Sequence, residues 1–360
     1  MVIGRRQLLS IALGLSATAI TSRGSAAGPK SYDEAARAAR APLQATPRGR
    51  ELVRFATLAA NSHNTQAWTF TALANEITIE PDFARRTPAV DPDDHHLFVS
   101  LGCATENLVH AAEMLGLTAN PVVDGDRIVI ALETTSARQS ALADAIPRRQ
   151  CTRTTFDGAP VASDALRRLE SACQEPGISA ILLTDRAAMS GVADYVLEGN
   201  SAQMRDKAFM DELVKWIRFS EADAVATMDG LFSRASGNAA LPAWIARPLL
   251  KFVFTENGEN KKYRAQIDSS AGIVVLAANR SDKAHWIAVG RACQRFGLQA
   301  TALGLKYAFI NQPVEVAALR PQFARSLGLG ERRPDIVMRF GAGPDLPRSL
   351  RRAPEDVMRG

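Results

Sequence analysis

The most informative stretch of the chain is Leu58-Ala-Ala-Asn-Ser-His-Asn-Thr-Gln-Ala-Trp-Thr-Phe70, a polar loop between a helical pattern and a strand pattern. Within it, the side chains of Ser62, Asn64 and Gln66 carry uncharged donors and acceptors that suit hydrogen bonding to a polar ligand. The aromatic residues that follow would anchor a strand that holds the loop in place. The alternative is a polar loop whose side chains cap the preceding helix.

On both sides of this stretch, the spacing of apolar residues predicts helices and strands. The elements expected before residue 146 are a helix from about residue 47, strands at 68–72 and 76–80, a helix at 97–115 and a strand at 127–133. Those expected after it are a helix at 163–174, a strand at 178–184, a long helical and irregular segment at 186–264, a strand at 271–277, a helix at 286–304 and a strand at 335–341. The helices 97–115 and 286–304 occupy comparable places, which suggests an internal duplication. Two unrelated buried helices would give the same pattern.

Two further segments are rich in arginine. The first is residues 147–153, Pro-Arg-Arg-Gln-Cys-Thr-Arg, and the second is residues 347–352, Pro-Arg-Ser-Leu-Arg-Arg. In the first segment, arginines at this spacing can converge on a phosphate, because the guanidinium fork matches phosphate oxygens. The alternative for that segment is a basic turn exposed to solvent.

Taken in order, these segments resemble three motifs of the nitroreductase superfamily: S-x-N-x-Q-P-W-x-F, R-x-S-x-R and a C-terminal R-R-P-x-x-E-V. The sequence departs from them at Ala67, where the usual residue is Pro, and at Cys151, where it is Ser. The combination resembles the fused, Acg-like branch of the superfamily, and the resemblance covers roughly residues 48–357.

This resemblance implies an α+β, nitroreductase-like fold in which two degenerate repeats, 48–145 and 146–360, form an intramolecular pseudo-dimer. It implies an FMN cofactor and NAD(P)H-dependent two-electron reduction of a nitroaromatic or quinone-like acceptor. The alternative is a protein that stores FMN and turns over little. No side chain is expected to be catalytic, because the flavin performs the chemistry. The residues expected to bind FMN are Ser62, His63, Asn64, Gln66, Arg148, Arg149, Gln150, Cys151, Arg153, Gly304, Leu305, Arg351 and Arg352.

The distribution of the motifs predicts a single flavin site. The first repeat contains the S-x-N-x-Q loop, but Pro47-Arg-Gly-Arg50 lacks the spacing of the arginine motif. The second repeat contains the arginine motif, but Gln174-Glu-Pro-Gly-Ile-Ser179, in the comparable place, is not an S-x-N-x-Q loop. Each half-site therefore survives once, so one chain should bind one FMN and could act as a monomer.

The long segment 186–264 exceeds what is needed to connect its neighbours. Long insertions are often functional, and a lid over the flavin is expected here, with peripheral packing as the alternative. Trp216 and Trp244 are the residues expected to lie near the flavin ring, because aromatic side chains supply large flat contacts.

Other residues that attract attention are given structural roles. Asp91, Asp93, Asp94, His95 and His96 could suggest a metal site, but acidic residues are favoured at a helix N-terminus and no metal is expected. No G-x-G-x-x-G motif opens a helix after a strand, so a Rossmann domain is unsupported. The four cysteines, at 103, 151, 173 and 293, form no C-x-x-C pair, and no disulfide is expected.

The N-terminus predicts export. Arg5-Arg6 precede an apolar run that is too short to span a membrane, and small residues follow it, so residues 1–27 resemble a twin-arginine (Tat) signal. An ordinary Sec signal or an uncleaved anchor is the alternative. Residues 28–47 should form an arm. The formal net charge is +5, with three arginines in the signal segment, and it gives no argument for binding nucleic acid. The mature protein is expected to be periplasmic, without stable membrane insertion, and to have small-molecule partners.

Overall fold

The computed structural model describes residues 31–246, 248 and 254–359. The expected signal segment, residues 1–27, therefore lies outside the described residues. Of the expected arm, the described part contains helix α1 (Tyr32–Ala39). Within the described part of the chain, no helix is both long enough and apolar enough to cross a membrane.

The first half of the chain forms a four-stranded antiparallel sheet with the strand order β1-β2-β4-β3. Its strands are β1 (Trp68–Ala72), β2 (Glu76–Pro81), β3 (Leu117–Asp124) and β4 (Arg127–Thr134). Helix α2 (Arg48–Thr57) precedes β1, and helix α3 (His95–Met114) connects β2 to β3. The most buried residues of β4 alternate with more exposed ones, as expected for a sheet with one face on the core.

The second half repeats this topology. Its antiparallel sheet has the order β5-β8-β10-β9, and its strands are β5 (Ile178–Leu183), β8 (Gly272–Ala278), β9 (Lys306–Phe309) and β10 (Ile336–Gly341). Helix α5 (Ser163–Ala172) precedes β5, and helix α11 (Lys283–Ala302) connects β8 to β9. When the strands of each half are counted in chain order, the two sheets have the same order. The expected α+β class is confirmed, and the repeated topology supports a duplicated chain.

The two long helices cross at a local twofold axis. Both α3 and α11 have 20 residues, and the eighth residue of each, Gly102 and Gly290, lies at the crossing. A Cβ at Gly102 would lie 2.0 Å from the carbonyl oxygen of Ile287, and one at Gly290 would lie 2.0 Å from that of Val99. Val99 and Ile287 are each the fifth residue of their helix. This reciprocal contact is the pattern of a symmetric dimer interface, here within one chain.

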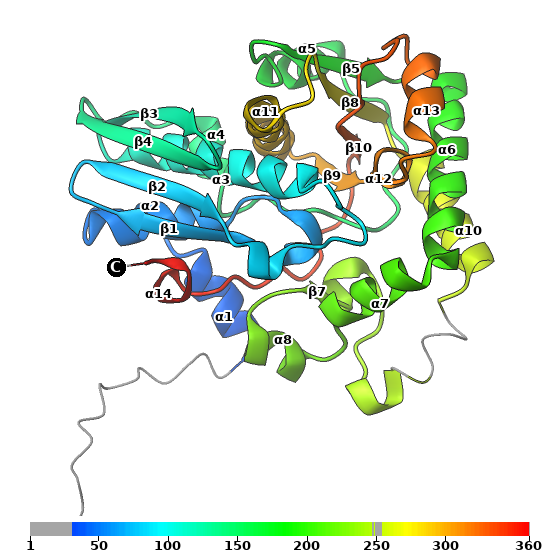
Figure 1. The fold of residues 1–360 in the computed structure, drawn as a ribbon, viewed down its shortest axis with the longest axis horizontal. Coiled ribbons are helices and arrows are strands. Elements are labelled where there is room, and N and C mark those ends of the chain that lie inside the picture. The colour runs from blue at the N-terminus through cyan, green and yellow to red at the C-terminus, as the bar shows by residue number, and fades with distance from the viewer. Residues whose placement is uncertain (1–30, 247, 249–253, 360) are drawn as a thin grey trace, which may run out of the picture.

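The halves differ most in the connection between their first two strands. A short turn joins β1 to β2, whereas an insertion joins β5 to β8. The insertion contains α6 (Arg186–Arg205), α7 (Lys207–Trp216), β6 (Ile217–Arg218), α8 (Glu221–Thr227), β7 (Leu231–Phe232) and α10 (Glu256–Asp268). Figure 1 shows α6 and α10 beside the second sheet, close to α13 (Arg320–Ser326). Their apolar side chains form a second core against this sheet, so β8 is buried along its whole length.

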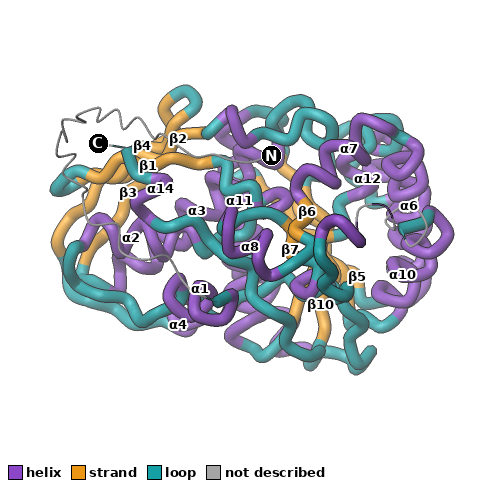
Figure 2. The backbone as a smooth tube through the Cα atoms, turned by 90° about the horizontal axis from the view of Figure 1, so that it is seen from below, coloured by secondary structure: helices purple, strands orange, loops and turns teal. Residues whose placement is uncertain are grey.

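The tail and the N-terminal arm join parts that are distant in sequence. The tail returns to the first half, where α14 (Pro354–Val357) packs on α2 and Met358 forms a parallel bridge with Phe70. The arm helix α1 packs against α8 of the insertion, and the rings of Tyr32 and Phe232 lie 4.5 Å apart. Figure 2 shows α1 and α8 on the same side of the molecule.

Candidate functional site

Two adjoining cavities lie where the two halves meet the insertion. The larger has a volume of about 590 Å³ and the smaller about 50 Å³. They share five lining residues, Ala60, Asn61, Arg153, Leu231 and Phe309. The larger volume lies in the range of small-molecule and cofactor sites, and the smaller cavity can hold only a compact group.

The loop between α2 and β1 contributes one wall to both cavities. Ser62 and His63 line the large cavity and Asn64 lines the small one. The loop is tightly wound: His63, Asn64 and Gln66 have positive φ angles of 45°, 52° and 53°. Such conformations cost residues other than glycine about 1–3 kcal/mol each, and they persist where surrounding contacts enforce them. Here the side-chain oxygen Oδ1 of Asn61 accepts the Gln66 N–H at 2.9 Å and closes the loop.

Asn64 ties this loop to the insertion and to the tail. Its Nδ2 donates to the carbonyl oxygens of Gly230 and Leu350 at 3.0 and 3.2 Å. Its Oδ1 accepts from Nη1 of Arg351 at 2.7 Å. The Asn64 amide therefore helps to hold the walls of the small cavity together.

Gln66 also holds the insertion and the tail together, but it lies outside both cavities. It is fully buried, donates to the Met228 carbonyl at 2.9 Å and accepts the Arg352 N–H at 2.8 Å. Because it lines neither cavity, its contribution is to join the insertion to the tail.

Five arginines line the small cavity, and no carboxylate is among its described lining residues. They are Arg40, Arg149, Arg153, Arg348 and Arg351. Burial, together with the charges of Arg348 and Arg149, lowers the pKa of Arg40 to about 9. Burial and the charges of Arg40 and Arg149 also hold the pKa of Arg351 well below its ordinary value. These guanidinium groups repel one another, so an anion in the cavity would stabilise them.

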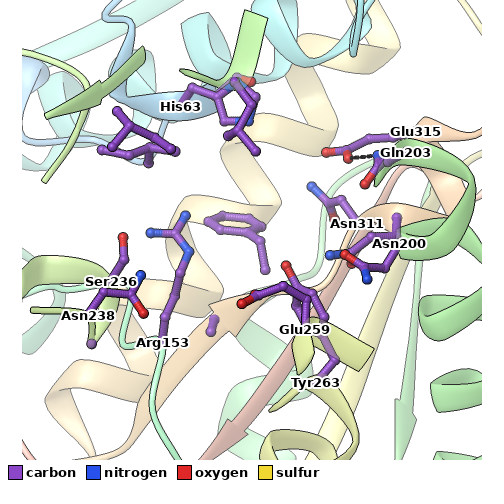
Figure 3. Close-up of a pocket in the computed structure, with 18 of the residues that line it drawn as sticks. His63, Arg153, Asn200, Gln203, Ser236, Asn238, Glu259, Tyr263, Asn311 and Glu315 are labelled. Atoms are coloured by element: carbon purple, nitrogen blue, oxygen red, sulfur yellow. Dashed lines mark hydrogen bonds between the residues drawn. The ribbon is translucent and has the colours of Figure 1, made fainter. Parts of the chain in front are cut away.

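The arginines differ in how much hydrogen-bonding capacity they have left. Arg149 donates to the Tyr307 hydroxyl at 2.6 Å and to the Leu58 carbonyl at 2.7 Å, while its buried Nε has no partner. Arg351 donates to the carbonyl oxygens of Thr57 and Ala59 and to the Asn64 amide oxygen. Within the described residues, the guanidinium of Arg153 has no hydrogen bond or ion pair, and Figure 3 shows it projecting into the large cavity.

Two of these arginines were not among the residues expected from the sequence. Arg40 follows α1 and donates to the Ser349 carbonyl at 2.9 Å, and nothing in the local pattern of the arm indicates this position. Arg348 belongs to the arginine-rich tail, so a signal existed, but the comparison of motifs selected Arg351 and Arg352 instead. Gln150 and Cys151, both expected, do line the small cavity.

Besides Gln66, four more of the expected residues line neither cavity. Arg148 is exposed, and Arg352 donates to a backbone carbonyl of the tail. Gly304 adopts a φ of +75° just after α11, and the Leu305 N–H returns to the Ala300 carbonyl at 2.8 Å. These two residues therefore end a helix, a common use of glycine, and line neither cavity.

The insertion forms much of the wall of the large cavity. Its aromatic and apolar contributors include Met204, Phe209, Leu213, Ile217, Phe219 and Tyr263. The expected tryptophans are not among the residues that line this cavity, so the structure gives no support to that expectation. Trp216 is buried among the side chains of Arg85, Lys215 and Arg218, and Trp244 is 78% exposed.

His63 is the ionisable group on the loop that lines the large cavity. Its Nδ1 is buried without a hydrogen-bond partner. Burial, with the nearby charges of Arg153 and His96, lowers its pKa to about 4. The imidazole is therefore neutral at physiological pH and adds no charge to the cavity wall.

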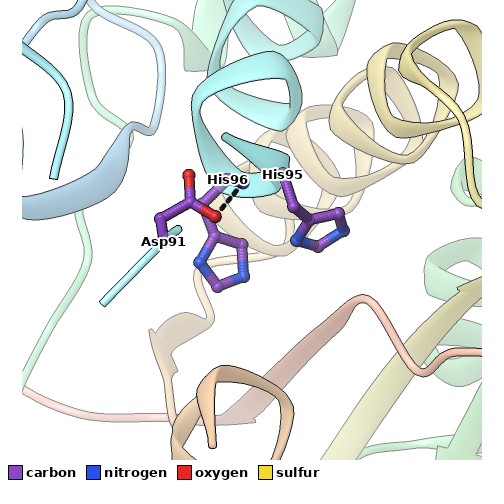
Figure 4. Close-up of side chains that lie close together, drawn as sticks. All are labelled: Asp91, His95 and His96. Carbon is purple, nitrogen blue, oxygen red and sulfur yellow. Dashed lines mark hydrogen bonds between the residues drawn. The ribbon is translucent and has the colours of Figure 1, made fainter. Parts of the chain in front are cut away.

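The cluster of acidic residues and histidines at the start of α3 serves the helix. Asp91 accepts the backbone N–H groups of His96 and Leu97, both at 3.0 Å, which agrees with the expected cap. Nε2 of His95 lies 2.8 Å from the Asp335 carboxylate. Potential ligand atoms of Asp91, His95 and His96 lie within 4.8 Å of one another, and Figure 4 shows the two imidazoles next to each other, with ring centroids 4.7 Å apart.

No protein-family model matches the chain. It is 25% identical over 336 residues to a Mycobacterium tuberculosis (strain H37Rv) protein provisionally named an NAD(P)H nitroreductase, and the alignment covers 86% of this chain and 92% of that protein. A protein from strain CDC 1551 of the same organism, with the same provisional name, aligns equally well.

Among solved structures, the FMN-dependent nitroreductase NfnB from Mycobacterium smegmatis, in complex with NADPH, aligns with 14% identity and a TM-score of 0.42. This alignment covers 61% of this chain and 97% of that one. An FMN-bound nitroreductase from Desulfitobacterium hafniense aligns with 14% identity and a TM-score of 0.40, covering 62% and 99% of the two chains. Both TM-scores lie below 0.5.

Proposed function

We propose that this protein is a nitroreductase-type oxidoreductase that binds one FMN per chain and transfers two electrons from NAD(P)H to a nitroaromatic or quinone-like acceptor. The observation that carries the proposal is the small arginine-lined cavity beside the large one, at the meeting point of the two complementary half-motifs. The similarity to a provisionally named NAD(P)H nitroreductase over 86% of the chain supports it.

The residues of the site fit FMN. Arg149 and Arg153 offer N–H donors without protein partners where a phosphate would be held. Ser62 and His63 offer uncharged polar groups to the larger part of the ligand. When bound, FMN supplies the chemistry by accepting a hydride and passing two electrons to the acceptor. The side chains of this protein bind and orient the cofactor, and the insertion limits the access of water.

Flavin content and turnover test the proposal. The purified protein should release one FMN per chain on denaturation, and it should oxidise NADH or NADPH when menadione or nitrofurazone is added. Preparations that do not bind added FMN would contradict the proposal, and two flavins per chain would contradict the single site.

A second candidate function is storage of FMN with little turnover. The observation that favours it is the insertion, whose helices α6, α7 and α10 all line the large cavity. An enzyme should be reduced rapidly by NADH under anaerobic conditions. A storage protein should stay oxidised with NADH but become reduced with dithionite, a small reductant.

We also propose export by the twin-arginine pathway, supported by Arg5-Arg6 and the short apolar run that follows. Replacing both arginines by lysine should leave the protein in the cytoplasm with its signal uncleaved. Unchanged delivery to the periplasm would favour the Sec pathway.

A further inference from the structure

The large cavity has two sides of opposite electrostatic character. Arg153 projects from one side, and the carboxylates of Glu259 and Glu315 lie on the other, as Figure 3 shows. Glu259 belongs to α10, which is part of the insertion, and Glu315 ends α12 (Gln312–Glu315). We call Glu259, Gln312 and Glu315 the acceptor wall, because their side-chain oxygens can accept hydrogen bonds from a ligand.

Glu315 is a half-buried carboxylate without a strong cationic partner. It accepts a hydrogen bond from Nε2 of Gln203 at 2.6 Å, and Nδ1 of His96 lies 3.8 Å away. No Lys or Arg side chain forms an ion pair with it within the described residues. Burial raises its pKa, as expected when desolvation is not offset by a nearby cation.

Glu259 is in a similar position. Its ion-pair partner is Lys262, which lines the same cavity one turn further along α10, at 3.8 Å. That ammonium also donates to Asn238 at 3.2 Å, so it is shared between two partners. Burial raises the pKa of Glu259 as well. Beside these carboxylates, Oε1 of Gln312 is buried without any hydrogen-bond partner. Each of the three groups of the acceptor wall therefore lacks either a hydrogen-bond donor or a close counter-charge from the protein.

Acceptors that are removed from water raise the free energy of the folded protein unless a donor or a cation interacts with them. A cationic or N–H-bearing group of a ligand would meet them, whereas an anionic group would be repelled. The phosphate of FMN has a separate place among the arginines, so the acceptor wall is available to the second substrate.

We infer that the acceptor wall selects the electron acceptor, and that the protein prefers aromatic acceptors with a cationic or hydrogen-bond-donating substituent over anionic acceptors of the same shape. This inference rests on the proposed function. For a nitroaromatic acceptor, the nitro group takes two electrons and two protons to give a nitroso group and water. One NADH and one proton supply these, and NAD⁺ is released.

Two probes of nearly equal shape and opposite charge test the inference: 4-nitrobenzylamine is cationic at neutral pH and 4-nitrobenzoate is anionic. We expect kcat/KM to be at least about tenfold higher for the amine, the factor that corresponds to 1.4 kcal/mol. Glu315→Gln and Glu259→Gln should each lower this ratio severalfold. Glu170→Gln, at an exposed position on α5 outside both cavities, is the matched control and should leave the ratio unchanged.

A binding measurement separates this inference from the proposed function. Calorimetric titration of the FMN-loaded protein with benzylamine and with benzoate, neither of which has a nitro group, reports selectivity without turnover. We expect benzylamine to bind more tightly, and Glu315→Gln to remove the difference. Equal or reversed affinities would overturn the inference even if menadione is reduced normally. If the glutamine variants lose FMN while the ratio stays constant, the carboxylates contact the flavin and the inference is also overturned. Loss of all menadione reduction in the wild type would instead contradict the proposed function.

Discussion

The loops at 58–67 and 173–177 occupy equivalent places, each between the first helix and the first strand of its half, yet their surroundings are opposite. The first loop is polar and lines both cavities. In the second, Glu175 lies 2.5 Å from Arg295 and 3.5 Å from Arg291, both on α11. Neither of the two cavities is lined by residues of this second loop.

Glu106 of α3 completes this ion-pair cluster. Its carboxylate lies 2.9 Å from Arg291 and 3.0 Å from Arg295, and its side chain is 3% exposed. The duplicated scaffold thus supports an open polar site on one side and a packed cluster of charges on the other. The two halves have kept the same topology while their sequences have diverged. Such divergence can leave one site where a symmetric dimer would have two.

The largest effect is expected when the charge cluster is broken. Glu106→Gln would leave Arg291 and Arg295 with Glu175 as their remaining carboxylate partner. Breaking a buried ion pair typically costs about 3–5 kcal/mol, so the free energy of unfolding should fall by about 3 kcal/mol. Chemical denaturation measures this change, and a change below about 1 kcal/mol would show that the cluster is not important for stability.

The same cluster predicts a pH dependence. Burial tends to raise the pKa of Glu106, but hydrogen bonding to His110 and the charges of Arg295 and Arg291 outweigh it and lower the pKa to about 2, from 4.5. Because the folded-state pKa is the lower one, this stabilisation is complete above about pH 4.5 and is lost as the pH falls toward 2. Glu106→Gln should flatten the stability profile of the protein in that interval.

At the polar site that the first loop lines, Arg153→Ala should weaken FMN binding by about 1.5–3 kcal/mol, the value of a charge-assisted contact. Riboflavin binding should stay nearly unchanged, because riboflavin has no phosphate. Arg153 is preferable to Arg149 for this test because its guanidinium forms no hydrogen bond with the described residues, so its removal should leave the fold intact. Fluorescence titration with both flavins measures the difference. Exposed Arg167 on α5 provides the control, and equal losses for FMN and riboflavin would place the phosphate elsewhere.

The reciprocal contact between helices α3 and α11 gives a fourth test. A Cβ at Gly290 would lie 2.0 Å from the Val99 carbonyl oxygen, so Gly290→Ala must push the helices apart. Overpacking of this kind costs about 1–3 kcal/mol. Gly191→Ala on α6, where a Cβ would meet nothing within 4 Å, should be neutral or stabilising by up to about 1 kcal/mol. Equal thermal stability of the two variants would mean that the crossing is loosely packed.

The smallest effect is expected at Trp244. Because this side chain is 78% exposed and lines neither cavity, Trp244→Ser should change the stability by less than about 0.5 kcal/mol. The rate of flavin reduction by NADH should also stay unchanged. A faster reduction in stopped-flow measurements would show that Trp244 does cover the flavin.

Local patterns in the sequence located both central helices, most of the strands and both half-motifs, but not strands β3 and β9. Apolar periodicity located α3, α11 and the buried strand β8 to within a few residues, because burial of one face or of a whole segment leaves a regular pattern. The loop at 58–67 and the arginines at 149 and 153 were recognisable because their chemistry is concentrated in short stretches.

The composition of the site depended on packing between distant parts of the chain. Arg40 and Arg348 meet in one cavity although about three hundred residues separate them, and Gln66 joins the insertion to the tail. The acceptor wall likewise combines α10 and α12, which no local pattern connects. Periodicity reports whether a residue is buried, but not which distant residues it will meet. Those neighbours are set by how the two halves, the insertion and the tail pack together, and this packing placed Arg40 at the site and left Trp244 in solvent.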